Sequence, residues 1–455
     1  MSDFTVRTIR LKINPAGDKD ARIAAWKRIR QICDDGWRAA NWIATGQLLN
    51  DQLIRRIYAR RKIDSRDLAA TSAVEQEFFN KAGFFQTKRQ ATTERDIKEA
   101  FPNLPPSVTN PLNQVVVASY NKEKKQLLMG QRSLRSYKQG MPVTVTQNSI
   151  AFSPGEKTDT VAWTIQRGEE IKFEIYYGRD KANFRHSVKR IIEGALKYSA
   201  PQIQYKDRDL FLLLPVQEPK KDTQLDPQVS VGVDLGLSIP ACISTNNGPA
   251  KMSIGSADDF LNARRQYQAR YRRLQRSLEM VKSGHGRSRK LKALDRLKEK
   301  EANFARMYNH FISKKIVDFS IKFNASRIKL ELLDGFSQEH QGSFVLRNWS
   351  YFQLQELIKQ KAVRENIEVV YVDPFHTSQT CSMCGNYEEG QRVDQKSFRC
   401  KKCGHEENAD MNAARNIAQS EVIVKKKEDC QYYRQGSLPE GEKAEASATD
   451  HSPTL

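Results

Sequence analysis

The sequence predicts a multidomain α+β protein, and three observations lead to this fold class. Apolar residues recur at helical spacing over residues 18–135, whereas short alternating runs typical of strands fill residues 136–217. After a polar linker, three short strands punctuated by glycine are followed by alternating helices and strands. Four cysteines in two close pairs interrupt this alternation near its end. A chain of 455 residues is long enough for several such domains.

The composition favours a polyanionic partner. The chain has 75 Lys and Arg residues against 54 Asp and Glu residues, which gives a formal net charge of +21, and such an excess attracts nucleic acid. A merely solubilising surface is the alternative, although such surfaces more often mix signs, with a net charge of about 2–8 for a small domain. With a mean hydropathy of −0.67 and no apolar signal core at the N-terminus, we expect neither membrane binding nor secretion.

The chain opens with a predicted strand and a helical block. Apolar residues alternate in two successive phases between residues 4 and 13, which predicts a strand with one change of phase, such as a bulge. The helices expected after it cover about residues 18–37, 46–61, 70–82, 93–100 and 112–128. The core-facing stripe of the first helix starts at Ile23. The tryptophans Trp26, Trp37 and Trp42 are expected in the core rather than on the surface as base-stacking platforms.

The segment after the helical block has the character of a β domain. Its expected strands cover residues 142–152, 161–166, 170–177 and 210–216, with one basic helix at about 184–197 between them. We expect the opening strand of the chain to pair with these strands. The helical block would then be an insertion within a β domain.

The second half of the chain predicts a different sheet. Its expected strands cover residues 229–236, 240–245, 250–254, 326–332 and 368–373. A long helical pair, broken at Ser283–Gly286, follows the third strand, a helix covers Trp349–Asn366, and a last helix starts at Asp410. Three strands, helix, strand, helix, strand, helix is the order of an RNase H-like sheet.

Three carboxylates fall where these elements suggest chemistry. Asp234 and Glu331 lie at or near the ends of apolar strands, where an uncompensated carboxylate is costly, and Asp410 lies in the first turn of the last helix. Each alone has a bland alternative, a strand-end contact with solvent or an ordinary acidic residue at a helix start. Together, on adjacent elements of one sheet, they predict a Mg²⁺ site. Two such ions, about 4 Å apart, would activate water and stabilise the leaving oxygen of a phosphodiester.

The cysteines predict one structural zinc ion. Two Cys-x-x-Cys pairs are separated by 15 residues, a spacing typical of a four-thiolate site and unlike that of chance thiols. The expected ligands are Cys381, Cys384, Cys400 and Cys403. Four thiolates complete a tetrahedron, so the flanking His376 and His405 are not expected to bind the ion, and no position stays open for catalysis. This pattern suits a reducing compartment better than a disulfide framework.

The helical pair carries a run of basic residues that predicts contacts with phosphates. Guanidinium groups suit phosphates, and each phosphate neutralised adds salt-dependent affinity. The candidate contacts are Arg264, Arg265, Tyr267, Arg270, Tyr271, Arg272, Arg273 and Arg276. The alternative is an ordinary solvated helix face.

At this point the motifs resemble a known family. The segments GVDLG, IKLELL, TSQTCSMCG, FRCKKCG and NADMNAARNIA resemble the RuvC-like nuclease half of transposon-encoded TnpB proteins and miniature type V-F CRISPR effectors. This resemblance covers about residues 229–418. The N-terminal half matches more loosely, through GQRSLRSYKQGMPV and through its helical insertion in a β domain.

The resemblance implies a domain layout and roles for individual residues. The layout is a β-barrel-like wedge domain (1–17 and 136–217), an inserted helical recognition domain (18–135), a linker (218–228), a RuvC-like nuclease (229–374 and 409–428), an inserted zinc ribbon that binds target nucleic acid (375–408) and a disordered tail (429–455). Asp234, Glu331 and Asp410 match the catalytic carboxylates, the four cysteines match the zinc ligands, and Arg392 falls where relatives carry an arginine near the active centre. One departure is that Glu331 is followed by two leucines, where many relatives have Asp-Leu.

The function that the resemblance implies is RNA-guided DNA cleavage with two Mg²⁺ ions in a single centre, in a prokaryotic cytoplasm. Its partners would be a guide RNA, a double-stranded DNA target and the displaced single strand. Type V-F relatives imply a homodimer on one guide RNA, whereas TnpB relatives act as monomers. Two alternatives stay open, a nuclease-dead guide-directed DNA-binding repressor and a guide-free RNase H-like nuclease or resolvase.

Overall fold

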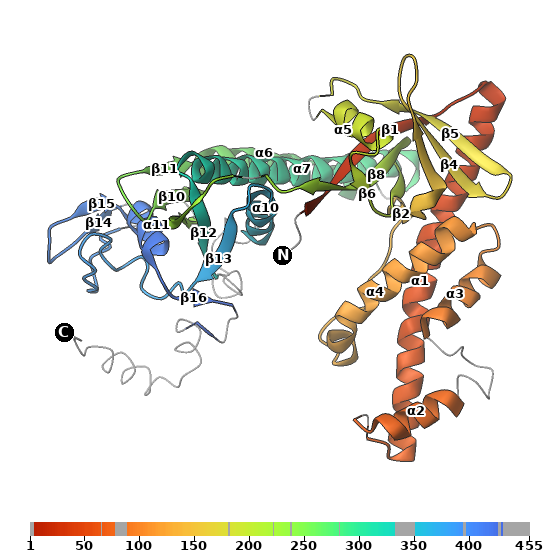
Figure 1. Ribbon diagram of the computed structural model, residues 1–455, viewed down its shortest axis with the longest axis horizontal. Helices are drawn as coiled ribbons and strands as arrows, with labels where there is room; N and C mark the ends of the chain where they lie inside the picture. The colour runs from red at the N-terminus through yellow and green to blue at the C-terminus, as the bar shows by residue number, and fades with distance from the viewer. Residues whose placement is uncertain are drawn as a thin grey trace. The chain divides into compact units, whose positions relative to one another are not determined.

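The structure is a computed structural model of the chain (Figure 1). It describes residues 4–64, 66–77, 89–180, 183–221, 223–236, 239–281, 283–332, 351–394, 397–425 and 429–430. The chain divides into two compact units, Met1–Glu218 and Pro219–Leu455. Each unit has its own sheet and its own hydrophobic core. No helix in these ranges is long and apolar enough to cross a membrane.

The first unit is built on one long helix. Its helices are α1 (Lys19–Arg61), α2 (Leu68–Gln76), α3 (Arg89–Ala100), α4 (Pro106–Leu128) and α5 (Phe184–Ile192), with a 3-10 turn η2 (Gln147–Ser149). The two helices expected between residues 18 and 61 are a single helix of 43 residues, so this prediction was wrong. Gly46 lies inside α1, where a Cβ atom would come within 3.2 Å of the Thr93 side chain, so the glycine permits a close approach to α3. Asp18 caps the start of the helix through its carboxylate, which accepts a hydrogen bond from the Ala21 amide at 2.8 Å.

The packing of α1 corrects two expectations about its apolar residues. Ile29 and Cys33 are buried as expected, but Ile23 is 56% exposed because the first six residues of the helix are exposed throughout. Trp42 is 52% exposed and touches Phe101 edge to face, so it is not a core residue. A helical stripe therefore identified the buried face but not where that face begins.

The sheet of the first unit confirms that the opening strand belongs to the β domain. Its strands are β1 (Phe4–Pro15), β2 (Val143–Thr144), β3 (Ile150–Ser153), β4 (Thr160–Gln166), β5 (Glu169–Tyr176), β6 (Lys197–Tyr198), β7 (Gln202–Lys206) and β8 (Asp209–Pro219). The order is β2-β7-β8-β1-β5-β4-β3, with β6 on β8, so β1 lies between β8 and β5. Burial alternates without interruption along β1, with Phe4 and Val6 facing outward, so the expected change of phase was wrong.

Other boundaries of the first unit also differ from expectation. The strand expected at 142–152 is two short strands separated by η2, and α5 ends at Ile192 because the left-handed Gly194 stops it. Strands β6 and β7 were missed, and β8 extends to Pro219, into the expected linker. Among the described residues, no pairing joins the end strands β2 and β3, so hydrogen bonds do not close the sheet into a barrel.

The second unit has the strand and helix order that the sequence predicts. Its strands are β9 (Asp226–Asp234), β10 (Ala241–Thr245), β11 (Lys251–Ile254), β12 (Ala325–Glu331), β13 (Glu368–Val372), β14 (Ser397–Arg399), β15 (Glu406–Asn408) and β16 (Ile423–Val424). Its helices are α6 (Ala257–Glu279), α7 (Gly284–Lys322), α10 (Tyr351–Arg364) and α11 (Ala409–Gln419). The linker expected at 218–228 is shorter, since β9 already starts at Asp226. The start of the helix expected at 349–366 and the tail from 431 to 455 lie outside the described residues.

The main sheet of the second unit has one apolar face and one polar face. Its order is β11-β10-β9-β12-β13-β16, with β9, β12 and β13 parallel and the outer strands antiparallel. Val231 and Val233 of β9 share a core with Ile316 and Phe319 of α7. The alternate residues of β9, such as Gly232, face α11. The carboxylates predicted on β9 and β12 therefore lie on the face that α11 covers.

Candidate active centre and metal site

The ends of β9 and β12 place two of the predicted carboxylates side by side. The two strands are parallel neighbours, with Leu330 opposite Val233. Asp234 and Glu331 each follow this pair by one residue, at the carboxyl end of their strand. Successive side chains of a strand point to opposite faces of the sheet, so Asp234 and Glu331 point to the same face, at the same end of the two strands.

Helix α11 brings the third carboxylate to the same edge. The Asn408 side chain caps the helix by accepting hydrogen bonds from the amides of Asp410 and Met411, at 3.0 and 3.2 Å. Asp410 is buried, and its Oδ2 atom lies 3.5 Å from the position that a Cβ atom on Gly236 would occupy. Asp410 thus lies against the turn that follows Asp234.

The C-terminal end of α11 is held by two buried polar residues of the sheet. Lys329 donates hydrogen bonds from Nζ to the carbonyl oxygens of Ala418 and Ser420, at 2.7 and 2.8 Å. Ser230 donates from Oγ to the same Ala418 carbonyl at 2.8 Å. A cation at free helix carbonyls is favoured by the helix dipole. Sequence reasoning missed this lysine, although its place between the apolar Ile328 and Leu330 of a buried strand is an unusual one that could have identified it.

Gly232 allows α11 to touch the backbone of β9, and this contact makes the first prediction. A Cβ atom at Gly232 would lie 2.1 Å from the carbonyl oxygen of Ala414 and 2.2 Å from the amide nitrogen of Ala418. Because neither backbone atom can turn aside, Gly232→Ala must push the helix away. We expect a loss of about 3 kcal/mol or more in the free energy of unfolding, measured by urea denaturation.

The control for this prediction is Gly286→Ala in helix α7. A Cβ atom there would meet only Val281, at an ordinary 3.7 Å. We expect this variant to be unchanged or up to about 1 kcal/mol more stable, because alanine favours helix. Equal stability of the two variants would contradict the close approach of α11 to β9.

Burial and neighbouring negative charge raise the pKa values of the three carboxyl groups. Burial and then the charges of Glu331 and Asp410 raise the pKa of Asp234 well above its usual value. Burial raises the pKa of Glu331 to about 7, against the opposing effects of Thr377 and Arg392. Burial also raises the pKa of Asp410, and Arg392 opposes this shift. The cluster therefore lacks enough positive charge to ionise fully, and a divalent cation would supply it.

Two side chains from the segment around the cysteines bind these carboxylates. Arg392 donates a hydrogen bond to Oδ1 of Asp410 at 3.1 Å, which places this arginine at the centre, as the family resemblance implies. Thr377 donates a hydrogen bond from Oγ1 to Oε1 of Glu331 at 2.6 Å. Sequence reasoning missed Thr377, because a loop hydroxyl has no periodicity to mark it.

The donor set of this centre fits divalent cations. It consists of carboxylate oxygens, which Mg²⁺ prefers. The three carboxylates are not among the groups of described residues whose ligand atoms all lie within 4.8 Å of one another. Two ions about 4 Å apart do not need them to be, because each ion can bind a different pair of carboxylates.

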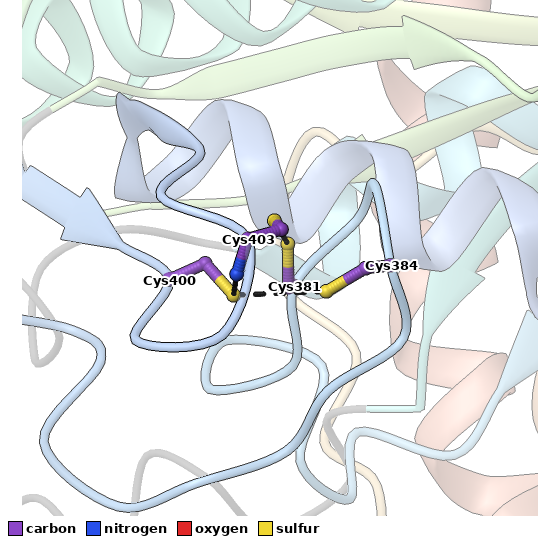
Figure 2. A group of neighbouring side chains, drawn as sticks. All are labelled: Cys381, Cys384, Cys400 and Cys403. Atoms are coloured by element: carbon purple, nitrogen blue, oxygen red, sulfur yellow. Dashed lines mark hydrogen bonds between the residues drawn. The ribbon is translucent and has the colours of Figure 1, made fainter.

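The four cysteines form a compact cluster, as the sequence predicts (Figure 2). Their sulfur atoms all lie within 4.8 Å of one another. The Sγ–Sγ distance is 3.7 Å between Cys381 and Cys403, and 3.6 Å between Cys384 and Cys400. A tetrahedral zinc ion with Zn–S bonds of about 2.3 Å requires sulfur atoms roughly 3.8 Å apart. The cluster therefore has the size of a zinc site.

The surroundings of the sulfur atoms differ from one cysteine to the next. Burial alone would raise the pKa of Cys400, but the backbone amides of Cys403 and Lys402 lower it to about 6, whereas burial raises the pKa of Cys381 to about 12. The Cys403 amide donates to the Cys400 sulfur at 3.4 Å. His405 pairs with Glu407 at 3.4 Å. It is not among the residues of the four-cysteine cluster.

Two asparagines of α11 form hydrogen bonds with the backbone of the segment around Cys381. Asn412 donates to the carbonyl of Thr380 at 2.7 Å and accepts from the amide of Ser382 at 2.9 Å. Asn416, one turn further on, donates to the carbonyls of Thr377 and Thr380 at 2.8 and 2.7 Å. The helix that carries Asp410 is thus bonded to the loop that enters the cysteine cluster.

The helical pair α6–α7 separates the predicted nucleic-acid contacts into two groups. Arg264 pairs with Glu301 of α7 at 2.9 Å and is mostly buried. Tyr267 packs on Phe304, and Tyr271 lies under the ammonium group of Lys298. These three residues face the partner helix rather than solvent.

The remaining candidates of the pair lie on the surface. The exposed ones are Arg265, Arg270, Arg272, Arg273 and Arg276. Beside them is a hollow of about 440 Å³, which is lined by Arg270, Arg273, Leu274, Ala293, Arg296, Leu297 and Lys300. The structure therefore retains an exposed basic face on α6, without the two tyrosines.

Comparisons with known proteins agree with this architecture. Residues 351–417 match the family model described as Cas12f1-like, TNB domain. The chain is 33% identical over 307 residues to the CRISPR-associated endodeoxyribonuclease Cas12f1 of Sulfoacidibacillus thermotolerans, which covers 65% of this chain and 72% of the relative. It is 35% identical over 220 residues to a Cas12f1 of Syntrophomonas palmitatica, but spans only 44% of that relative's length.

A solved structure shows the same fold. It is a chain from the cryo-EM structure of a Cas12f1–sgRNA–target DNA complex, with a TM-score of 0.70. The match covers 93% of this chain and 100% of the other, at 18% identity. The two chains therefore share a multidomain α+β fold.

Proposed function

Because the chain belongs to the Cas12f1 family of CRISPR-associated endodeoxyribonucleases, we propose that it is an RNA-guided DNA endonuclease. The family resemblance found in the sequence is confirmed by the relatives. The observation that carries the proposal is the meeting of Asp234, Glu331 and Asp410 at one end of the sheet, where burial and then the charges of the other two raise the pKa of Asp234. Divalent cations stabilise such a group of carboxylates in the ionised form, and phosphodiester hydrolysis uses these cations.

The finer architecture belongs to the same proposal. The sheet of the second unit is an RNase H-like, RuvC-type nuclease domain (229–374 and 409–428), and the segment 375–408 is its inserted zinc ribbon, which binds target nucleic acid. In the first unit, residues 1–17 and 136–217 form a wedge domain and 18–135 a recognition domain. The strand order β11-β10-β9-β12-β13 and the pairing of β1 with β5 support this assignment.

In the proposed centre, the three carboxylates would hold two Mg²⁺ ions. When bound, these ions supply the activation of water and the stabilisation of the leaving oxygen at a DNA phosphodiester. Asp234 and Glu331 provide ligands from the rigid sheet, and Asp410 from α11. Arg392 orients Asp410 by a direct hydrogen bond. The four cysteines would hold one Zn²⁺ ion, which stabilises the fold without chemistry.

The proposed partners are a guide RNA and a DNA duplex. The guide pairs with the target strand, and the protein holds the heteroduplex through backbone and shape, while the displaced strand enters the same centre. The net charge of +21 supplies the sequence-independent attraction. We also propose a homodimer on one guide RNA and a site of action in a prokaryotic cytoplasm.

The direct experiment is to purify the full chain from its host and sequence the RNA that accompanies it. A repeat-derived guide supports the proposal, whereas a transposon-end RNA would indicate TnpB-like use of the same centre. The complex is then tested with a DNA target matched to that guide in Mg²⁺. Activity on junctions or flaps without RNA would instead indicate a guide-free nuclease, and tight target binding without cutting would indicate a repressor.

The exposed face of α6 gives a prediction about salt dependence. Arg272 and Arg276 are exposed and one helical turn apart. If each neutralises a phosphate, the Arg272→Ala/Arg276→Ala double variant should weaken nucleic-acid binding uniformly across sequences. It should also reduce the slope of log K against log salt by about 1 for each phosphate that is no longer neutralised, as measured by fluorescence anisotropy.

The control for the salt prediction is Arg264→Ala. Since Arg264 pairs with Glu301 inside the helical pair, this variant should lower the melting temperature and leave the salt slope unchanged. An unchanged slope in the double variant as well would remove this face of α6 from the interface.

A further inference from the structure

Thr377 contacts both Glu331 at the end of β12 and the helix α11, which carries Asp410. It lies in the turns between β13 and Cys381. Its hydroxyl donates to Oε1 of Glu331 at 2.6 Å and also lies 3.1 Å from the carbonyl of Pro374. The hydroxyl has only one proton to donate, and a hydrogen bond to a carboxylate is stronger than one to a neutral carbonyl, so Glu331 is the favoured acceptor. The backbone carbonyl of Thr377 accepts a hydrogen bond from Asn416 of α11 at 2.8 Å.

We propose that Thr377 is a positioning residue, which fixes the Glu331 carboxylate relative to the helix that carries Asp410. This inference rests on the proposed function, because it assigns Thr377 a role toward the ligands of that centre. The residue would act through Glu331 and would not itself touch substrate. It joins one end of β12 to α11 through two hydrogen bonds, one from its side chain and one to its backbone.

The physical need for such a residue follows from the position of Glu331. Its backbone is held, because Glu331 pairs with Val372 of β13 and Gln355 donates a hydrogen bond to its carbonyl at 3.2 Å. Its side chain, however, has several rotatable bonds, and ordering them costs conformational entropy. Asp410 has Arg392 to orient it. For Glu331, the Thr377 hydroxyl takes the corresponding place. Groups hydrogen-bonded to metal ligands typically change metal affinity or activity by about 10–100-fold when removed.

The backbone around Thr377 is shaped to hold the hydroxyl in place. Phe375 donates its amide to the Asp373 carboxylate at 3.1 Å, which closes a tight turn. His376 is left-handed, with φ of 57°, and its ring lies between those of Phe375 and Tyr387, with centroids 3.7 and 3.9 Å away. A left-handed conformation at a residue other than glycine is costly and persists only when its surroundings enforce it.

The test compares three substitutions in the full chain with its guide RNA. Thr377→Val removes the hydroxyl and keeps the shape, whereas Thr377→Ser keeps the hydroxyl. Thr245→Val is the matched control, because the Thr245 hydroxyl donates to the local carbonyl of Asn247 at 2.6 Å, and β10 pairs Thr245 with Val231, away from Asp234. The readouts are the single-turnover cutting rate at saturating matched target, the target Kd in Ca²⁺, and Mn²⁺ binding measured by electron paramagnetic resonance.

We expect Thr377→Val to lose about 10–100-fold in cutting rate or in Mn²⁺ affinity, with an unchanged target Kd, melting temperature and zinc content. Thr377→Ser should retain most of the rate, and Thr245→Val should behave like the wild type. If Thr377→Val equals Thr245→Val in all readouts while the wild type cuts, Thr377 has no positioning role. If the wild type does not cut its matched target, the proposed function fails instead, and the two failures remain distinct.

Discussion

Replacing Asp234 with alanine is expected to abolish DNA cutting while leaving target binding intact. Asp234 lies at the end of β9, beside Glu331 on the neighbouring strand, and the charges of Glu331 and Asp410 add to burial in raising its pKa. Its loss removes a direct ligand of the proposed ions. The cutting rate should therefore fall by more than the roughly 10–100-fold that loss of an indirect partner costs. The measurement is the single-turnover rate on a matched target in Mg²⁺, beside the target Kd in Ca²⁺.

The matched control is Asp226→Ala, which changes the same residue type at the opposite end of the same strand. Asp226 accepts a hydrogen bond from the Gln228 amide at 2.8 Å and lies at the start of β9. It should bind and cut like the wild type, apart from a small loss of stability. Wild-type cutting by Asp234→Ala would mean that hydrolysis takes place elsewhere.

Replacing Cys400 with serine is expected to have the second large effect. Structural zinc sites contribute apparent binding free energies of about 10–16 kcal/mol in small peptides, so loss of one thiolate should release the ion and loosen the segment 375–408. That segment supplies both Thr377 and Arg392 to the carboxylates. We expect zinc content measured by mass spectrometry to fall, and cutting to decline by at least the roughly 10–100-fold expected for the loss of one such partner.

Cys33→Ser is the control for the metal site. Cys33 is buried in the first unit and is not one of the four clustered cysteines. This variant should keep its zinc. If Cys400→Ser also kept a full complement of zinc, the four-thiolate assignment would be wrong.

The sequence could predict those parts of the site that are marked by a run of apolar residues or by a fixed spacing between residues of one type. Apolar runs that stop at Asp234 and Glu331 indicate buried strands with a carboxylate at the end, because a buried strand needs continuous apolar residues. The pairs of cysteines indicate a shared ion through their spacing alone. Both signals can be read from short stretches of sequence. In the structure, Asp234 and Glu331 lie at the same end of neighbouring strands, and the four sulfur atoms lie within 4.8 Å of one another.

The parts that sequence missed depend on tertiary contacts without a local pattern. Thr377 is one hydroxyl in a polar loop, and only the fold places it beside Glu331. Lys329 was missed for a different reason. Its charge suggests an exposed position, but the residue is buried, and its long side chain reaches the carbonyls at the end of α11. The continuity of α1 through Gly46 was also missed, because glycine weakens a helix without necessarily ending it.

The basic residues of α6 carry a spacing that distinguishes its buried face from its exposed one. Arg264, Tyr267 and Tyr271 recur at three- and four-residue steps, which places them on one helical face. The structure turns that face to α7. Charge alone could not separate Arg264 from Arg272, whereas the tyrosine spacing could have done so.

The most direct test of the proposed centre is to locate Mn²⁺ by anomalous X-ray scattering in crystals of the full chain with its guide RNA and target DNA. We predict anomalous peaks that contact the carboxylates of Asp234, Glu331 and Asp410, with two ions about 4 Å apart. Peaks that leave two of these carboxylates without a metal contact would contradict the proposed centre.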